Sequence, residues 1–168
     1  SISRLSAEGM TYAATHAGLL VAHQSIYFVQ RLAASALNPP GSVKDVMGAL
    51  SGFGWLGTLL IPLLPIPEDV VSGDSALYLL HVLATSMAFA GFEGWLILWF
   101  RTMAQTGSLR SGFVYRAVQG ALAFMVAAHV GAWRTGKYNY LLLQTVFYAI
   151  FSAQHLMVLY DLCYSKMF

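Results

Sequence analysis

The chain has 168 residues, of which 58% are hydrophobic and 10% charged, with a mean hydropathy of +0.64. Soluble domains usually carry about a quarter charged residues, so this composition excludes an ordinary soluble domain and indicates a membrane protein. The formal net charge of +2 comes from few charges and implies no nucleic-acid-binding face. A single cysteine, Cys163, excludes an internal disulfide.

The first apolar segment, residues 11–37, is the most polar of five such segments. Its polar side chains include His16, His23, Gln24, Gln30 and Arg31. We interpret it as a span packed against partner helices, with an amphipathic helix lying at the membrane interface as the alternative. The sequence Asn-Pro-Pro-Gly at 38–41 ends it, because two prolines cannot continue a helix.

The second segment, residues 46–66, has about the ~20 residues that a bilayer core requires. Gly48 and Gly52 have the spacing that lets two helices approach closely, and we predict that they pack against a neighbouring helix. A series of prolines and an acidic loop follow.

The third segment, residues 76–100, is interpreted as the most hydrophobic of the five and is closed by Arg101. The fourth and fifth segments cover residues 113–133 and 138–160, and we expect Asp161 to close the fifth. The predicted fold is therefore all-α: one integral-membrane domain over residues 1–168, a polytopic bundle of five transmembrane helices, or four if the first is interfacial.

The loops predict an orientation. If all five segments span, one side carries Arg31, Lys44, Arg101, Arg110, Arg116 and Lys166, and the other carries Arg4, Arg134 and Lys137. The positive-inside rule then places the C-terminus in the matrix or cytoplasm. The start at Ser1 rather than Met suggests a removed presequence or a truncated chain.

Glu93 is the one acid inside a predicted span. A carboxylate in hydrocarbon must be neutral, paired or turned toward a polar cavity. We expect a hydrogen bond between helices, with His155 or Arg116 as its partner. A proton-linked or quinone-linked role is the alternative.

Three histidines, His16, His81 and His129, fall at one depth of the predicted membrane. Two histidines from separate helices can ligate haem iron, and three can hold copper or zinc. Small residues beside His129 would admit a porphyrin, so His81 and His129 are the candidate ligands of haem b. Histidines hydrogen-bonded across a helix interface are the competing interpretation, and no metal site is predicted.

Residues 81–91, His-Val-Leu-Ala-Thr-Ser-Met-Ala-Phe-Ala-Gly, resemble the His-rich first helix of CopD-like copper-resistance membrane proteins and their eukaryotic four-helix relatives. Residues 129–133, His-Val-Gly-Ala-Trp, are similar to later parts of the eukaryotic group. The resemblance implies a helical bundle and no more. The extra leading segment and Gln154-His155, near where those relatives tend to carry Asn, depart from the pattern, so no copper site is carried over.

No catalytic motif is present in the sequence: it has no Cys-x-x-Cys, no Gly-rich phosphate loop and no His-Glu-x-x-His. The predicted function is a non-catalytic accessory subunit, which partners other subunits of a respiratory-chain or ATP-synthase complex in the mitochondrial inner membrane. Arg101, Arg110 and Arg116 are the candidate residues for binding cardiolipin or another phospholipid. The alternatives are a redox anchor that binds haem b or quinone, a small transporter or metal-handling protein, and a bacterial inner-membrane location.

Overall fold

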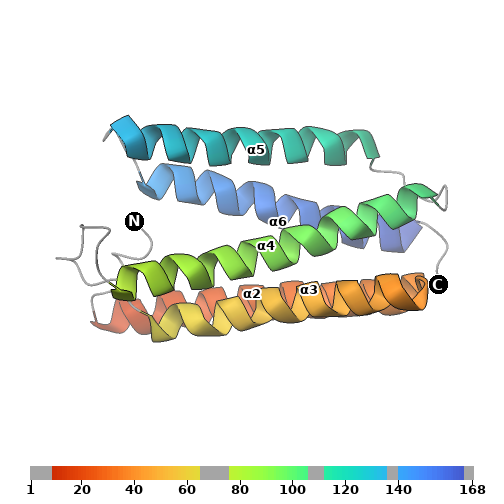
Figure 1. Ribbon diagram of the computed structural model, residues 1–168, viewed down its shortest axis with the longest axis horizontal. Coiled ribbons are helices and arrows are strands. Elements are labelled where there is room, and N and C mark those ends of the chain that lie inside the picture. Colours follow the sequence, from red (N-terminus) through yellow and green to blue (C-terminus); the bar gives the residue numbers. More distant parts are fainter. Residues whose placement is uncertain (1–8, 65–75, 106–111, 136–139, 165–168) are drawn as a thin grey trace. The chain divides into compact units, whose positions relative to one another are not determined.

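The computed structural model describes residues 9–64, 76–105, 112–135 and 140–164, and within these ranges it leaves some side chains undescribed. Every element in the described ranges is helical, which confirms the all-α prediction. The α-helices are α2 (Gly9–Leu37), α3 (Gly41–Leu60), α4 (Ala76–Gln105), α5 (Gly112–Thr135) and α6 (Tyr140–Tyr164), with a short 3-10 helix η1 (Ile61–Leu63) after α3 (Figure 1). Each α-helix overlaps one of the five apolar segments, but α3 ends at Leu60, before the predicted end of the segment at residue 66.

The helices form two compact units. The first runs to Thr102 and contains α2, α3, η1 and most of α4, whereas the second begins at Met103 and contains α5 and α6. Successive helices within each unit run antiparallel (Figure 1). The assembly of all five helices into one membrane domain stays a prediction.

The turn between α2 and α3 is determined by its residues. Asn38 takes a left-handed backbone conformation, with φ of 43°, and its N–H donates to the carbonyl of Ala34 at 3.2 Å. Asparagine tolerates this conformation better than most residues, and it ends α2 as an αL cap does. Pro40 then precedes α3 and accepts the first helical hydrogen bond, from the N–H of Lys44 at 3.0 Å.

α3 and α4 touch through their backbones. A Cβ added to Gly57 would lie 2.6 Å from the carbonyl oxygen of Ala84, and one added to Gly91 would lie 2.6 Å from that of Leu50. Real Cβ atoms essentially never approach another atom within 3.0 Å, so only glycine permits this contact. Close approach through small residues is the usual way in which membrane helices associate.

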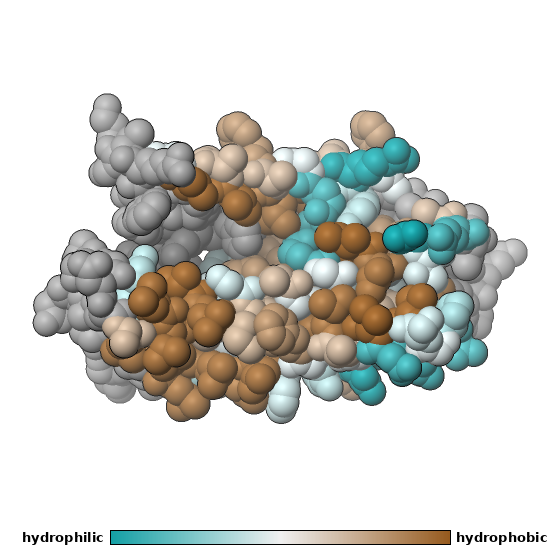
Figure 2. Space-filling model, viewed as in Figure 1, coloured by the Kyte–Doolittle hydropathy of each residue, from teal (hydrophilic) through white to brown (hydrophobic). Residues whose placement is uncertain are grey.

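Two helices in the described part of the chain are long and apolar enough to cross a bilayer, judged by length and composition. They are Gly41–Leu63, which joins α3 and η1, and Ala76–Gln105. Hydrophobic residues cover the end of this pair where α3 finishes and α4 begins, and hydrophilic residues gather toward the opposite end (Figure 2). Leu56, Leu63, Leu79 and Leu83 are among the exposed apolar side chains. These features favour association with a membrane.

Candidate functional site

The buried face of α2 is polar. His16, His23 and Gln30 are all buried, and they follow one another at intervals of seven residues, about two helical turns. The exposed side chains of the same helix include Val21 and Phe28, at 67% and 68% exposure. Gln24 and Arg31 are exposed as well, so α2 buries polar side chains on one face and exposes large apolar side chains beside polar ones, whereas a helix of a soluble protein buries an apolar face.

Phe92 of α4 contacts the polar buried face of α2 and also lies against α3. The side-chain amide of Gln30 donates to the carbonyl of Phe92 at 3.3 Å. The ring of His23 stacks on the ring of Phe92, with centroids 6.1 Å apart and planes 24° apart. On α3, a Cβ added to Gly54 would lie 2.6 Å from the Phe92 ring, so the glycine makes room for it. One aromatic side chain thus joins all three helices of the first unit.

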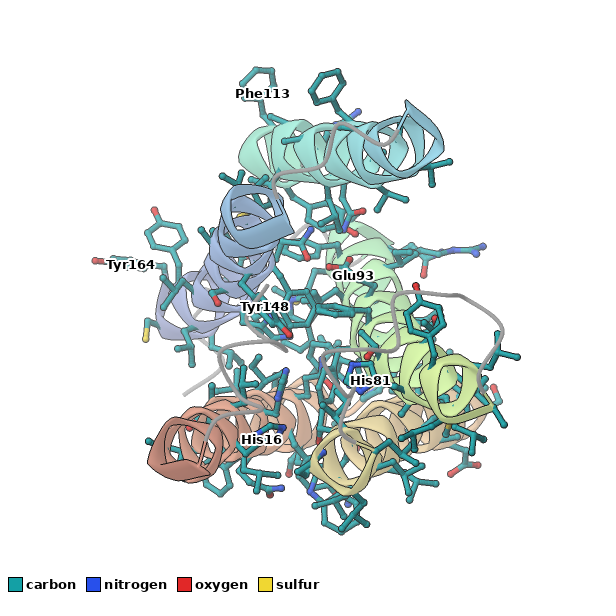
Figure 3. The ribbon with its side chains drawn as sticks, turned by 90° about the vertical axis from the view of Figure 1, so that its left-hand side faces the viewer. His16, His81, Glu93, Phe113, Tyr148 and Tyr164 are labelled. Atoms are coloured by element: carbon teal, nitrogen blue, oxygen red, sulfur yellow. The ribbon has the colours of Figure 1, made fainter. Side chains whose placement is uncertain are left out.

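His81 is held in one tautomer. Its Nδ1 lies 2.6 Å from the carbonyl oxygen of Leu64, just after η1. Because a carbonyl oxygen only accepts, Nδ1 carries the hydrogen and donates it, and Nε2 of the neutral ring keeps its lone pair. His16 is close enough to interact electrostatically with His81, and both side chains project from α2 and α4 into the interior of the unit (Figure 3). The structure therefore brings together two of the three histidines that share a predicted depth.

The predicted haem ligand pair is divided between the two units. His81 is in the first unit, and His129 is in α5 of the second, where its side chain is undescribed. A ring nitrogen that donates to a carbonyl is the usual support of a ligating histidine, so His81 has the chemistry of a ligand. Among the described residues, no three His, Cys, Asp or Glu side chains are grouped to hold a metal ion. Haem ligation by His81 and His129 stays a prediction.

The buried polar residues predicted on α4 and α6 also lie in separate units. Glu93 is partly buried in the first unit. His155 is buried in the second, where its Nδ1 donates to the carbonyl of Phe151 at 3.0 Å and its ring meets that of Phe151 edge-on at 4.9 Å. A hydrogen bond from Glu93 to His155 or Arg116 stays a prediction.

The three arginines predicted to bind phospholipid are spread along the chain. Arg101 is exposed near the end of α4 in the first unit, and Arg116 is exposed in α5 of the second. Arg110 lies outside the described residues. Their binding of cardiolipin stays a prediction.

Gly48 and Gly52 are not the glycines that bring α3 against α4. No atom lies within 4 Å of a Cβ added to Gly52, and one added to Gly48 would meet only Nη1 of Arg31, at 3.5 Å. The glycines at the contact, Gly54 and Gly57, follow Gly52 by two and five residues, which turns them about 200° and about 140° around the helix axis. Contact of Gly48 and Gly52 with a helix of another protein stays a prediction.

The sequence interpretation missed several residues that the structure makes central. Gly54, Gly57 and Gly91 form the closest helix contact. Asp161 was expected to close the fifth span, but it is fully buried and α6 continues to Tyr164. Its seven-residue interval from the buried Gln154 repeats the interval on α2, and this was the signal that could have identified it.

No protein-family model, curated protein or solved structure matches the chain. The resemblance to CopD-like proteins stays a prediction.

Proposed function

We propose that this protein is a non-catalytic accessory subunit of a multi-subunit membrane complex, with a respiratory-chain or ATP-synthase complex of the mitochondrial inner membrane as its host. The observation that carries the proposal is that α2 buries His16, His23 and Gln30 while the large apolar side chains of Val21 and Phe28 are exposed. Polar side chains are costly in hydrocarbon and turn toward protein, whereas apolar side chains face lipid freely.

The hydroxyl groups of the first unit support the membrane setting. Ser25 donates to the carbonyl of Val21 at 2.9 Å, although Ser25 is exposed. Thr85 and Thr102 make the same bond to the carbonyl four residues earlier, at 2.9 and 2.8 Å. Such bonds satisfy a hydroxyl where no water is available, because the helix itself supplies the acceptor.

A glycine on a second face of α3 supports the proposal that this protein is a subunit of a larger complex. α4 occupies the face of Gly54 and Gly57, but Gly52 has no atom within 4 Å of an added Cβ. A glycine on the surface of a membrane helix admits a closely packed neighbour. A helix of another subunit would bury this open position as α4 buries Gly54 and Gly57.

The test is to express the tagged full-length chain in its own membrane, extract it with a mild detergent and run a native gel. We expect it to resist alkaline carbonate extraction and to migrate with proteins many times its mass of 18.3 kDa. Replacing Gly52 with Leu should lower assembly and leave insertion intact, and the same replacement at Gly41, which also has open space but lies at the start of α3 before the predicted span, is the matched control. Migration at its own mass, or activity as an isolated catalyst, would contradict the proposal.

A redox anchor that binds haem b or quinone is the second candidate, favoured by the tautomer of His81 and its proximity to His16. The test is a reduced-minus-oxidised spectrum of the purified protein. A haem band that disappears in His81→Ala would favour this function. Loss of electron or proton transfer in Glu93→Gln, with assembly preserved, would favour it as well.

A further inference from the structure

The side chain of Arg31 lies across α3 at Gly48. A Cβ added to Gly48 would be 3.5 Å from Nη1 of Arg31, so the guanidinium group lies over a position where α3 has no side chain. Arg31 belongs to α2, seven residues before Asn38 begins the turn to α3. The arginine therefore spans the two helices close to the turn that joins them.

A second cation lies next to this position. Lys44 is four residues before Gly48 on α3, which places the two residues on the same face of the helix. Arg31 and Lys44 are both exposed. The acidic neighbour Asp45 is also exposed and lies three residues before Gly48, so one negative charge accompanies the two positive ones and the local net charge is positive. Two positive groups, one of them a guanidinium that can bind two oxygens at once, therefore share one surface position.

Apolar surface begins directly beside these cations. Phe28 lies one turn before Arg31 on α2, and Val21 lies two turns further in the same direction, away from the turn to α3. Both are exposed by about two thirds, at 68% and 67%. A charged group near the helix end followed by apolar surface matches the layout of a lipid, with its phosphate at the interface and its acyl chains toward the bilayer centre.

The same end of the first unit carries a third cation. The contacts of α3 with α4 pair Gly54 with Gly91 and Leu50 with Gly94. When the antiparallel register of these contacts is continued along α3 and α4, Arg101 lies at the same level as Lys44. This end of the unit is therefore positive, which favours an anionic lipid over a zwitterionic one.

We propose that Arg31 and Lys44 bind the phosphate of an anionic phospholipid at the α2–α3 turn, that Gly48 leaves the space in which Arg31 takes up this position, and that the acyl chains lie along Phe28 and Val21. The proposal depends on the membrane placement proposed above. It differs from the cardiolipin prediction in the residues that bind the lipid, which are Arg31 and Lys44 rather than Arg101, Arg110 and Arg116.

The experiment uses the purified full chain, delipidated in mild detergent and titrated with dioleoylphosphatidylglycerol or dioleoylphosphatidylcholine, with bound lipid counted by native mass spectrometry. Phosphatidylglycerol should bind more tightly. Arg31→Gln and Lys44→Gln should each weaken its binding about fivefold, equivalent to about 1 kcal/mol for one basic side chain at an anionic surface. Circular dichroism confirms that each variant keeps its helices.

The matched pair Gly48→Leu and Gly52→Leu separates this site from a general loss of helix packing. Both variants add the same side chain to the same face of α3, one turn apart, but only Gly48 lies beneath Arg31. Gly48→Leu should lower phosphatidylglycerol binding, and Gly52→Leu should bind like the parent protein. Equal binding by these two variants, unchanged binding in Arg31→Gln, or displacement of the lipid by millimolar inorganic phosphate would overturn the proposal. A chain that binds the lipid but migrates alone on the native gel would contradict the subunit role and leave the lipid site intact.

Discussion

Described hydrogen bonds of buried polar side chains differ in reach between the two units. In the first unit, the amide of Gln30 on α2 donates to the carbonyl of Phe92 on α4. His81 on α4 donates to the carbonyl of Leu64, which lies just after η1. In the second, His155 donates to Phe151, one turn earlier in α6. A bond between elements depends on the register in which they pack, whereas a bond within one turn forms in any packing. Gln30 and His81 therefore help to select the arrangement of the helices in the first unit.

The strongest test of this contrast is Phe92→Ala. The substitution removes the ring that stacks on His23 and fills the space beside Gly54, so it leaves a cavity between three helices. Large-to-small changes of this kind cost about 3–5 kcal/mol. We expect a large drop in the thermal unfolding midpoint in detergent. A loss below about 1 kcal/mol would show that Phe92 does not join the helices.

Gly91→Leu should have the next largest effect. Its Cβ would collide with backbone atoms of Gly54 and Leu50, which cannot rotate away as a side chain can. Overpacking costs about 1–3 kcal/mol, and a backbone collision belongs at the upper end. Gly52→Leu is the control and should change stability little, because its surroundings are open. Equal melting temperatures for these two variants would contradict the close contact between α3 and α4.

Gln30→Leu tests the polar bond between α2 and α4. It removes the donor to Phe92 and keeps a side chain of similar length. Polar bonds between membrane helices are worth about 0.6 to 2 kcal/mol, and we expect a loss of about 1 kcal/mol. Chemical-denaturant or heat unfolding in detergent would measure it. A gain in stability would show that burying the amide costs more than its bond to Phe92 contributes.

The smallest expected effect is that of His155→Leu in the second unit. The bond from His155 to the Phe151 carbonyl lies within one turn of α6, and that carbonyl remains in the helix. Replacing a bonded polar group by an apolar one of similar size is often nearly neutral, so we expect a change below about 0.5 kcal/mol by the same unfolding assay. A loss as large as that of Gln30→Leu would remove the contrast between the units.

Much of the helical layout could be predicted because its signals are local. The residues Asn38, Pro39 and Pro40 stop α2 at Leu37, where the sequence interpretation ended its first segment. The start of α4 at Ala76 was predicted as well. The end of α6 was not predicted. In the sequence, the charge of Asp161 indicates a membrane boundary, whereas in the structure that side chain is fully buried.

The sequence predicted only the types of residue at the candidate site and not all of their contacts. Histidines at matching depth were visible in the sequence, and the structure places His16 near His81. The carbonyl of Leu64 could not be expected as the partner of His81, because it follows a 3-10 turn whose position depends on how α3 meets α4.

By itself, the sequence determined that this protein is built of long apolar helices, where most of them begin and end, and which polar residues they carry. Each of these depends on composition, on periodicity or on a few neighbouring residues. Only the tertiary structure decided that Gly54, Gly57 and Gly91, rather than Gly48 and Gly52, bring α3 against α4. The physical reason is that glycines on opposite faces of one helix are equivalent until a second helix packs against one face.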